Sequence, residues 1–154
     1  MQNKIKTETR LAFIQFIFSS LFSDTSLDEN IDEFENYFYK LSVSSIEQNK
    51  QTSINFNKNY FKKLTLSYNE FIKKNDFENT INNLINFNRK FENWDSINKS
   101  IILSILSELE ITKKEKVKIL LNDYFNISKM LIPIKEVGMI NAIADKYINE
   151  KNII

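Results

Sequence analysis

The chain has 154 residues and a net charge of +1, and hydrophobic residues make up 42% of it. This is enough for one domain with a core that needs no disulfide or metal. The absence of cysteine and histidine excludes disulfides, thiolate zinc sites and histidine general bases. A single glycine excludes a glycine-rich phosphate loop. Catalysis is therefore disfavoured, and we expect no cofactor and no metal site, although carboxylate chemistry remains open.

The first predicted helix runs from about Ile5 to Phe22 and contains the apolar segment LAFIQFIFSSLF, residues 11–22. Basic residues precede this segment, which superficially resembles a signal peptide. However, Gln15 interrupts the apolar run, no small-residue cleavage site follows, and the segment is too short to span a bilayer. We therefore predict a buried first helix in a cytoplasmic protein with no membrane partner.

A polar linker is predicted between the second and third helices. The sequence SLDE at residues 26–29 has the form of a capping box and predicts a helix that continues to about Leu41. The polar segment 42–53 follows, and a third helix is predicted over about 54–73. We predict a single domain, 1–154, with possible helical halves 1–91 and 92–154. The linker at 42–53 is a further place where two helical halves could separate.

Three further helices are predicted before the last one. The fourth covers about 77–91, and Asp95 is expected to cap the fifth, in which apolar residues recur every four positions from Ile97. Thr112 with Glu115 forms a second capping box, which predicts the start of the sixth helix.

The last predicted helix contains the segment MINAIADKYI, residues 139–148. Pro133 fits its first turn, where the missing N–H costs nothing. Apolar residues stand at i, i+3, i+4 and i+7 from Ile140, and Asn141 lies beside that face. The scarcity of glycine and proline disfavours tight β-hairpins. We therefore predict an all-α fold of about seven helices in two small bundles.

Charge is unevenly distributed along the chain. Residues 24–35 hold six acids and no base, which predicts an acidic helix that either faces a basic partner or is simply solvated. Basic residues gather in the opening ten residues and again at 113–118, where four lysines accompany one glutamate. Each group alone is more often plain solvated surface. Together they permit one patch for an anion and another for a basic partner.

Motifs on several predicted helices carry a resemblance to a known family. The first helix has Arg10, Gln15, Ile17 and Phe18 at the spacing R-x-x-x-x-Q-x-L-Y. The middle of the chain matches at Tyr60 and Leu64. The fifth, sixth and last helices match at Ile97, Lys99, Ile101, Leu103, Glu108, Leu109, Val117, Asn122, Asp123, Ile127, Lys129, Asn141, Asp145 and Lys146. In their order and spacing these segments resemble the NusB family of bacterial transcription antitermination factors, with residues 30–90 matching only loosely.

The resemblance implies a function in binding rather than in chemistry. Members bind boxA-type single-stranded RNA together with the ribosomal protein NusE, and act on ribosomal RNA transcription through RNA polymerase and other Nus factors. The RNA-binding residues it implies here are Lys4, Lys6, Arg10, Gln15, Lys118, Lys135, Met139 and Asn141. In this interpretation Lys4, Lys6 and Arg10 contact phosphates, while Gln15 and Asn141 contact base edges. The chain could also form a weak homodimer.

The chain departs from the family pattern where RNA binding is expected. Only Lys4, Lys6 and Arg10 stand in place of the arginine cluster, which predicts weaker RNA binding with a shallower salt dependence. Met139 replaces a phenylalanine and Ala142 a glycine, so close backbone approach near Ala142 is in doubt.

Plainer interpretations remain open for several of these residues. Asn141 could form a hydrogen bond between helices, near Asn122, and Gln15 could form a hydrogen bond in the interior. We expect Phe18 to lie in the core. Two other functions also remain. One is a helical protein-interaction module of NusB-like fold that has lost RNA binding. The other is a carboxylate enzyme using Glu108, Asp123 and Asp145.

Overall fold

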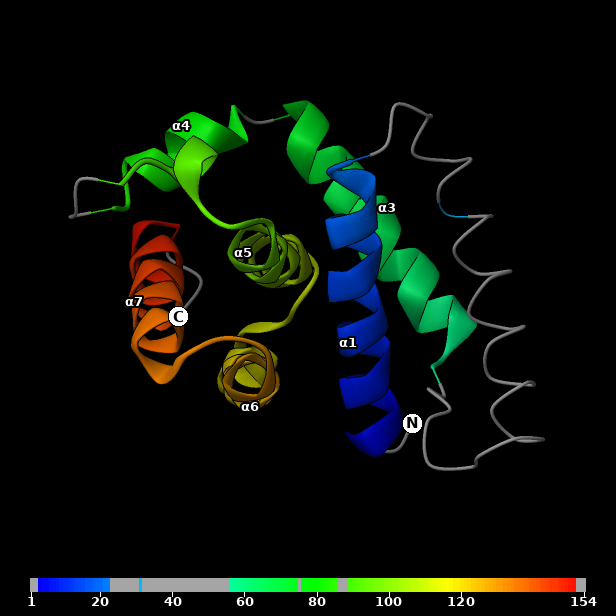
Figure 1. Cartoon of the computed structure of the whole chain (residues 1–154). Coiled ribbons are helices and arrows are strands. Elements are labelled where there is room, and N and C mark those ends of the chain that lie inside the picture. Colours follow the sequence, from blue (N-terminus) through cyan, green and yellow to red (C-terminus); the bar gives the residue numbers. More distant parts are fainter. Residues whose placement is uncertain (1–2, 23–30, 32–55, 75, 86–88, 152–154) are drawn as a thin grey trace.

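The described part of the chain is built of helices and the turns between them (Figure 1). The computed structural model describes residues 3–22, 31, 56–74, 76–85 and 89–151, and no β-strand occurs in these ranges. The elements are α1 (Asn3–Ser20), α3 (Lys58–Lys74), α4 (Phe77–Asn82), η2 (Phe91–Asn93), α5 (Ser96–Leu109), η3 (Lys114–Lys116), α6 (Val117–Leu131) and α7 (Ile134–Glu150), where η marks a short 3₁₀ helix. The all-α prediction is confirmed.

Helix α5 lies at the centre of the described helices and contacts α1, α3, α6 and α7 (Figure 1). Its residues from Ser100 to Leu109 are all buried, which is typical of a helix enclosed on every side. Three of them are serines whose hydroxyls donate to carbonyl oxygens of the same helix at 2.7 Å: Ser100, Ser104 and Ser107. These small side chains therefore leave room for the neighbouring helices without leaving a buried hydroxyl unpaired.

Aromatic rings on α1 and α3 fill the space on one side of α5. Phe16 of α1 meets Phe61 of α3 edge-on at 5.8 Å between ring centroids, and Phe13 meets Tyr68 at 6.3 Å. Each of these four rings is at most 4% exposed. Full burial of one phenylalanine contributes about 1.5–3 kcal/mol, so this layer supplies much of the core.

The apolar face predicted for the last helix is confirmed. Ile140, Ile143, Ala144 and Tyr147 are all buried in α7. Pro133 stands one residue before the helix, and its carbonyl oxygen accepts the N–H of Val137 at 3.1 Å. Its missing N–H therefore costs no helical hydrogen bond, as expected.

Two helices differ from their predicted lengths because asparagine side chains bind backbone groups nearby. Helix α3 begins at Lys58 because the Asn57 Oδ1 atom accepts the N–H of Tyr60 at 2.8 Å. Helix α4 ends at Asn82, well before the predicted end at 91, and Asn82 Oδ1 accepts the N–H of Phe91 at 2.8 Å. Such side-chain bonds compete with continuation of the helix.

The capping box predicted for the sixth helix is wrong, whereas the predicted start of the fifth is confirmed. The Thr112 hydroxyl donates to the Glu108 carbonyl oxygen at 2.5 Å instead of capping, and the 3₁₀ turn Lys114–Lys116 leads into α6. Asp95 occupies the N-cap position of α5, although its side chain makes no capping hydrogen bond.

Several sequence predictions fall on residues outside the described ranges. These are most of the helix predicted over 26–41, the linker 42–53 and most of the acidic segment 24–35. The division into two halves stays a prediction. None of the described helices combines the length and apolarity needed to cross a membrane.

Candidate functional site

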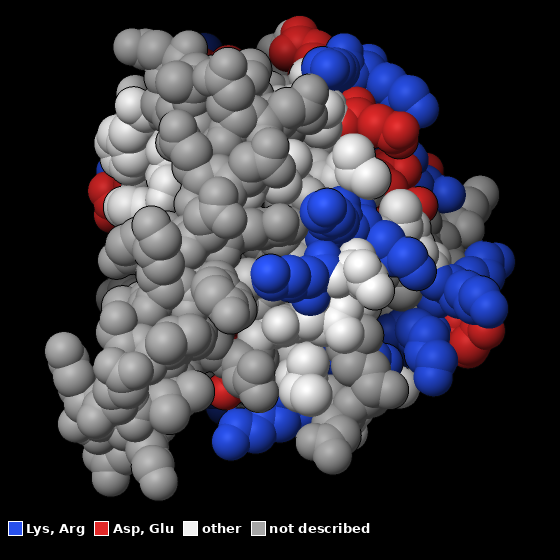
Figure 2. Space-filling view, turned by 90° about the vertical axis from the view of Figure 1, so that its right-hand side faces the viewer, with Lys and Arg blue, Asp and Glu red and all other residues white. Residues whose placement is uncertain are grey.

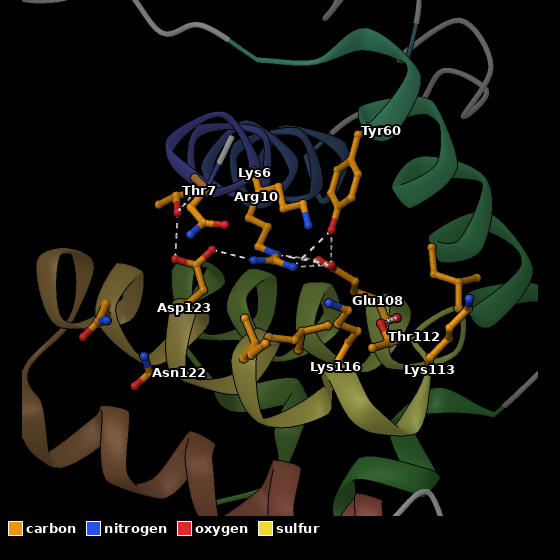
Figure 3. Close-up of a pocket in the computed structure, with 15 residues that line it drawn as sticks. Lys6, Thr7, Arg10, Tyr60, Glu108, Thr112, Lys113, Lys116, Asn122 and Asp123 are labelled. Atoms are coloured by element: carbon orange, nitrogen blue, oxygen red, sulfur yellow. Dashed lines mark hydrogen bonds and ion pairs between the residues drawn. The ribbon is translucent and has the colours of Figure 1, made fainter. Parts of the chain in front are cut away.

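A groove opens between the N-terminal half of α1, the start of α6 and Tyr60 of α3, with the end of α5 as its floor (Figure 3). Its volume is about 480 Å³. Most of its lining side chains are charged or polar, and they come from α1, α3, α5, α6 and the turn between α5 and α6. The groove is therefore a product of the tertiary fold.

Arg10 of α1 lies at the base of the groove and is only 7% exposed. Its Nε atom donates to both carboxylate oxygens of Glu108 at 3.1 and 3.2 Å, and Nη2 donates to Glu108 Oε2 at 2.9 Å. Its Nη1 atom donates to Asp123 Oδ2 at 2.6 Å. One guanidinium thus joins α1 to both α5 and α6 through charge-assisted hydrogen bonds.

Two tyrosines complete the shell around Glu108. The Tyr124 hydroxyl donates to Glu108 Oε1 at 2.8 Å, and the Tyr60 hydroxyl donates to Glu108 Oε2. The Arg10 guanidinium carbon lies 5.9 Å from the Tyr60 ring centroid and 5.6 Å from that of Tyr124, within cation–π range. The buried carboxylate is therefore fully engaged, which a buried charge requires.

This network fixes the protonation states of its members. Burial lowers the pKa of Arg10, but the hydrogen bond and charge of Glu108 outweigh burial, so the net shift is upward. Burial and then Glu108 raise the pKa of Tyr60 and Tyr124 above 10.0. The guanidinium therefore stays charged and both phenols stay protonated donors at neutral pH.

The groove as a whole is positive. Lys6, Lys113 and Lys116 line it, and within the described ranges none of them forms an ion pair. With Arg10 they bring four positive charges against the two carboxylates of Glu108 and Asp123, a balance of +2. Lys6 and Lys116 extend from opposite walls toward the Arg10–Glu108 pair (Figure 3). Such a groove attracts an anion.

A second hollow, of about 280 Å³, lies between α6 and α7. It contains two predicted site residues, the exposed Lys118 and the half-buried Asn141, together with Asn122 and Phe125. The alternative hydrogen bond of Asn141 to the Asn122 region is not formed, although both amides line this hollow.

A third, small hollow holds Met139, which is 36% exposed, beside Trp94, Asn98 and Glu136. Asn98 is 8% exposed, and its Nδ2 atom donates to Glu136 Oε1 at 3.2 Å. Its Oδ1 atom is buried and accepts no hydrogen bond within the described part of the chain. A buried acceptor without a donor costs about 1–3 kcal/mol, so the Asn98 amide lowers the stability of this region.

The predicted site residues therefore fall into separate groups. Lys6 and Arg10 share the positive groove, and Lys118 and Asn141 share the second hollow. Lys4 on α1 and Lys135 on α7 are exposed. Gln15 is half-buried without a side-chain hydrogen bond to any described residue.

The expectation that Phe18 lies in the core is wrong. Its ring is 39% exposed and contacts Phe22 at 5.3 Å between centroids, near the end of α1. One exposed ring thus lies in the last turn of α1 and a second just after the helix ends, whereas Phe13 and Phe16 of the same helix are buried.

The sequence singled out Arg10, Glu108 and Asp123, but it did not indicate that they bind one another. Glu108 carried one usable signal, because it is the acidic residue of α5, whereas Tyr124 resembled an ordinary core aromatic. The three carboxylates that suggested a carboxylate enzyme do not lie in one site, because Glu108 and Asp123 bind Arg10 and Asp145 lines a different hollow. The described residues contain no cluster of metal-ligating side chains.

Comparison with known proteins found two similar curated proteins. The transcription antitermination protein NusB of Rickettsia typhi is 29% identical over 97% of this chain and 96% of its own length. The protein of the same name from Rickettsia felis is 25% identical over the same shares. No family model and no solved structure gives a significant match. The chain is thus similar, over nearly its whole length, to two transcription antitermination proteins.

Proposed function

We propose that the chain is a transcription antitermination factor of the NusB family that binds boxA-type single-stranded RNA together with ribosomal protein NusE. The near full-length similarity to two NusB proteins carries this proposal. The all-α fold is compatible with it. In this role the chain recruits rather than catalyses, acting in the cytoplasm and reaching RNA polymerase and other Nus factors through its partners.

The charge of the groove supports the RNA half of the proposal. RNA backbones are held by lysine and arginine, and Lys6, Lys113 and Lys116 line one concave surface without an ion pair to any described residue. Figure 2 shows Lys and Arg side chains gathered on part of one face of the molecule. Lys4, Lys118 and Lys135 are exposed on the flanking helices and add to this attraction. Gln15 and Asn141 remain the proposed contacts to base edges, and Met139 remains a proposed RNA-binding residue.

In this proposal Arg10 does not bind RNA phosphate. All three of its nitrogen atoms already donate to Glu108, Asp123 or Tyr60. We assign it to positioning, because it fixes α1 against α6 and so sets the spacing of the lysines across the groove.

The charge of the third hollow supports the NusE-binding part of the proposal. The carboxylates of Asp95 and Glu136 line this hollow against one guanidinium, that of Arg89, and Met139 provides apolar surface beside them. A lysine or arginine of a basic ribosomal protein can donate hydrogen bonds to such carboxylates. Glu136→Gln should therefore weaken NusE binding, whereas Asn149→Ala, at an exposed position of the same helix, should leave it unchanged.

A fluorescence-anisotropy titration tests the function itself. A boxA-like RNA and a scrambled control are titrated with the protein, with and without its cognate NusE, at two salt concentrations. We expect selective binding that tightens with NusE and weakens with salt. Partner binding without RNA preference would instead favour the alternative, a helical interaction module that has lost RNA binding and is motivated by the thinned N-terminal charge.

A further inference from the structure

The positive groove and the second hollow meet at one residue. Asn122 of α6 lines both of them. In Figure 3 its side chain lies on the side of α6 that faces α7, away from Arg10. The two concave surfaces are therefore neighbours on either side of α6, joined by an exposed amide.

The two surfaces differ in charge. The groove carries a balance of +2, whereas in the second hollow Lys118 and Asp145 cancel. The rest of the second hollow is neutral and consists of Leu121, Phe125 and two asparagine amides. A cationic surface next to a neutral one matches a nucleotide, whose phosphate is charged and whose base is not.

The neutral hollow contains the groups that a base requires. The Asn122 and Asn141 amides make no side-chain hydrogen bond to any described residue, and each offers both a donor and an acceptor. Phe125 is partly buried, which holds its ring in place, and Lys129 Nζ lies 4.9 Å from the ring centroid. Aromatic rings stack on splayed bases of single-stranded RNA, and amides bind base edges.

We propose that the two surfaces form one track for single-stranded RNA, in which Lys6, Lys113 and Lys116 hold phosphate and Asn122, Phe125 and Asn141 hold the adjoining base. This inference rests on the proposed function. It adds a separation of phosphate contacts from base contacts across α6, with Asn122 at the junction. In this track Asn122 determines specificity, and Phe125 supports the base by stacking.

The phosphate contacts and the base contacts can be tested separately. Lys116→Gln should weaken binding of every RNA equally and reduce the slope of log affinity against log salt by about 0.7, the value for one phosphate contact on a single strand. Asn122→Ala should keep that slope but reduce the discrimination between a boxA-like RNA and single-base variants by about 5- to 150-fold at one RNA position. Phe125→Leu should weaken binding while retaining an apolar side chain at the α6 surface.

The matched control is Asn149→Ala, because Asn149 is exposed on α7 outside both surfaces. Circular dichroism establishes that each variant folds. If Asn122→Ala and Asn141→Ala leave base discrimination unchanged while the wild-type protein binds RNA selectively, the track is wrong and the proposed function stands. If the wild-type protein binds no RNA, the proposed function fails and the track fails with it.

Discussion

Arg10 shows how a single side chain organises this molecule. Its guanidinium is buried, yet it is paired with Glu108 and Asp123 and flanked by two tyrosine rings. Replacing a buried ion pair with apolar residues is often neutral for stability, whereas removing one partner leaves an uncompensated charge. We therefore interpret the network as a device that fixes geometry, and its stability effect depends on which partners remain.

The substitution Arg10→Met tests this interpretation. It leaves the Glu108 and Asp123 carboxylates without their cation, so the free energy of unfolding should fall by about 3–5 kcal/mol in urea denaturation. The control Lys4→Met, on an exposed position of the same helix, should change it by less than about 0.5 kcal/mol. Equal stability of the two variants would contradict a structural role for the ion pairs.

The buried tyrosines predict how stability depends on alkaline pH. The folded-state pKa values of Tyr60 and Tyr124 lie above 10.0, the value of an unperturbed tyrosine. Above pH 10 the unfolded chain releases these protons and the folded chain retains them. Their contribution to stability is thus complete below pH 10 and is lost as the pH rises toward the folded-state values.

The free energy of unfolding should accordingly fall as the pH rises above 10, and Tyr124→Phe should make that fall shallower. Urea denaturation at a series of pH values measures this slope, and ultraviolet absorbance reports tyrosinate formation. Reversible ionisation of Tyr60 and Tyr124 near pH 10 in the folded protein would show that the prediction is wrong.

Among the helices, α5 determines how closely the others pack. Its buried serines bind their own helix, so a hydroxyl can be removed at little cost while added volume cannot be accommodated. Ser104→Ala should change the free energy of unfolding by no more than about 1 kcal/mol. Ser104→Leu should lower it by about 1–3 kcal/mol or more through overpacking. Thermal unfolding of the two variants measures this difference. A Ser104→Leu variant as stable as Ser104→Ala would contradict this packing.

Some helix boundaries follow from sequence patterns, and others do not. The apolar face of α7 and the start of α5 follow from local periodicity and capping, which the sequence displays directly. The end of α4 depends on a bond between the Asn82 side chain and Phe91, and the start of α6 on a 3₁₀ turn. Local propensity does not specify such bonds, so these boundaries could not be predicted.

For the whole molecule, the candidate site depends on contacts that no local pattern displays. Arg10 meets Glu108 across 98 positions and Asp123 across 113. Sequence reasoning could predict that Arg10 and the lysines are important, but not that Arg10 pairs with carboxylates while Lys6, Lys113 and Lys116 line one groove. The asymmetric charge of two adjoining hollows is likewise a property of the packed helices.

The most direct test of the central claim, that RNA binds over the groove and along α6, is a map of backbone amide NMR shifts in the isotope-labelled protein on titration with a boxA-like RNA. We expect the largest changes in the first turns of α1, in residues 112–126 and in the Asn141–Asp145 turn of α7. Changes confined to α4 and the end of α3, or no change at RNA saturation, would contradict it.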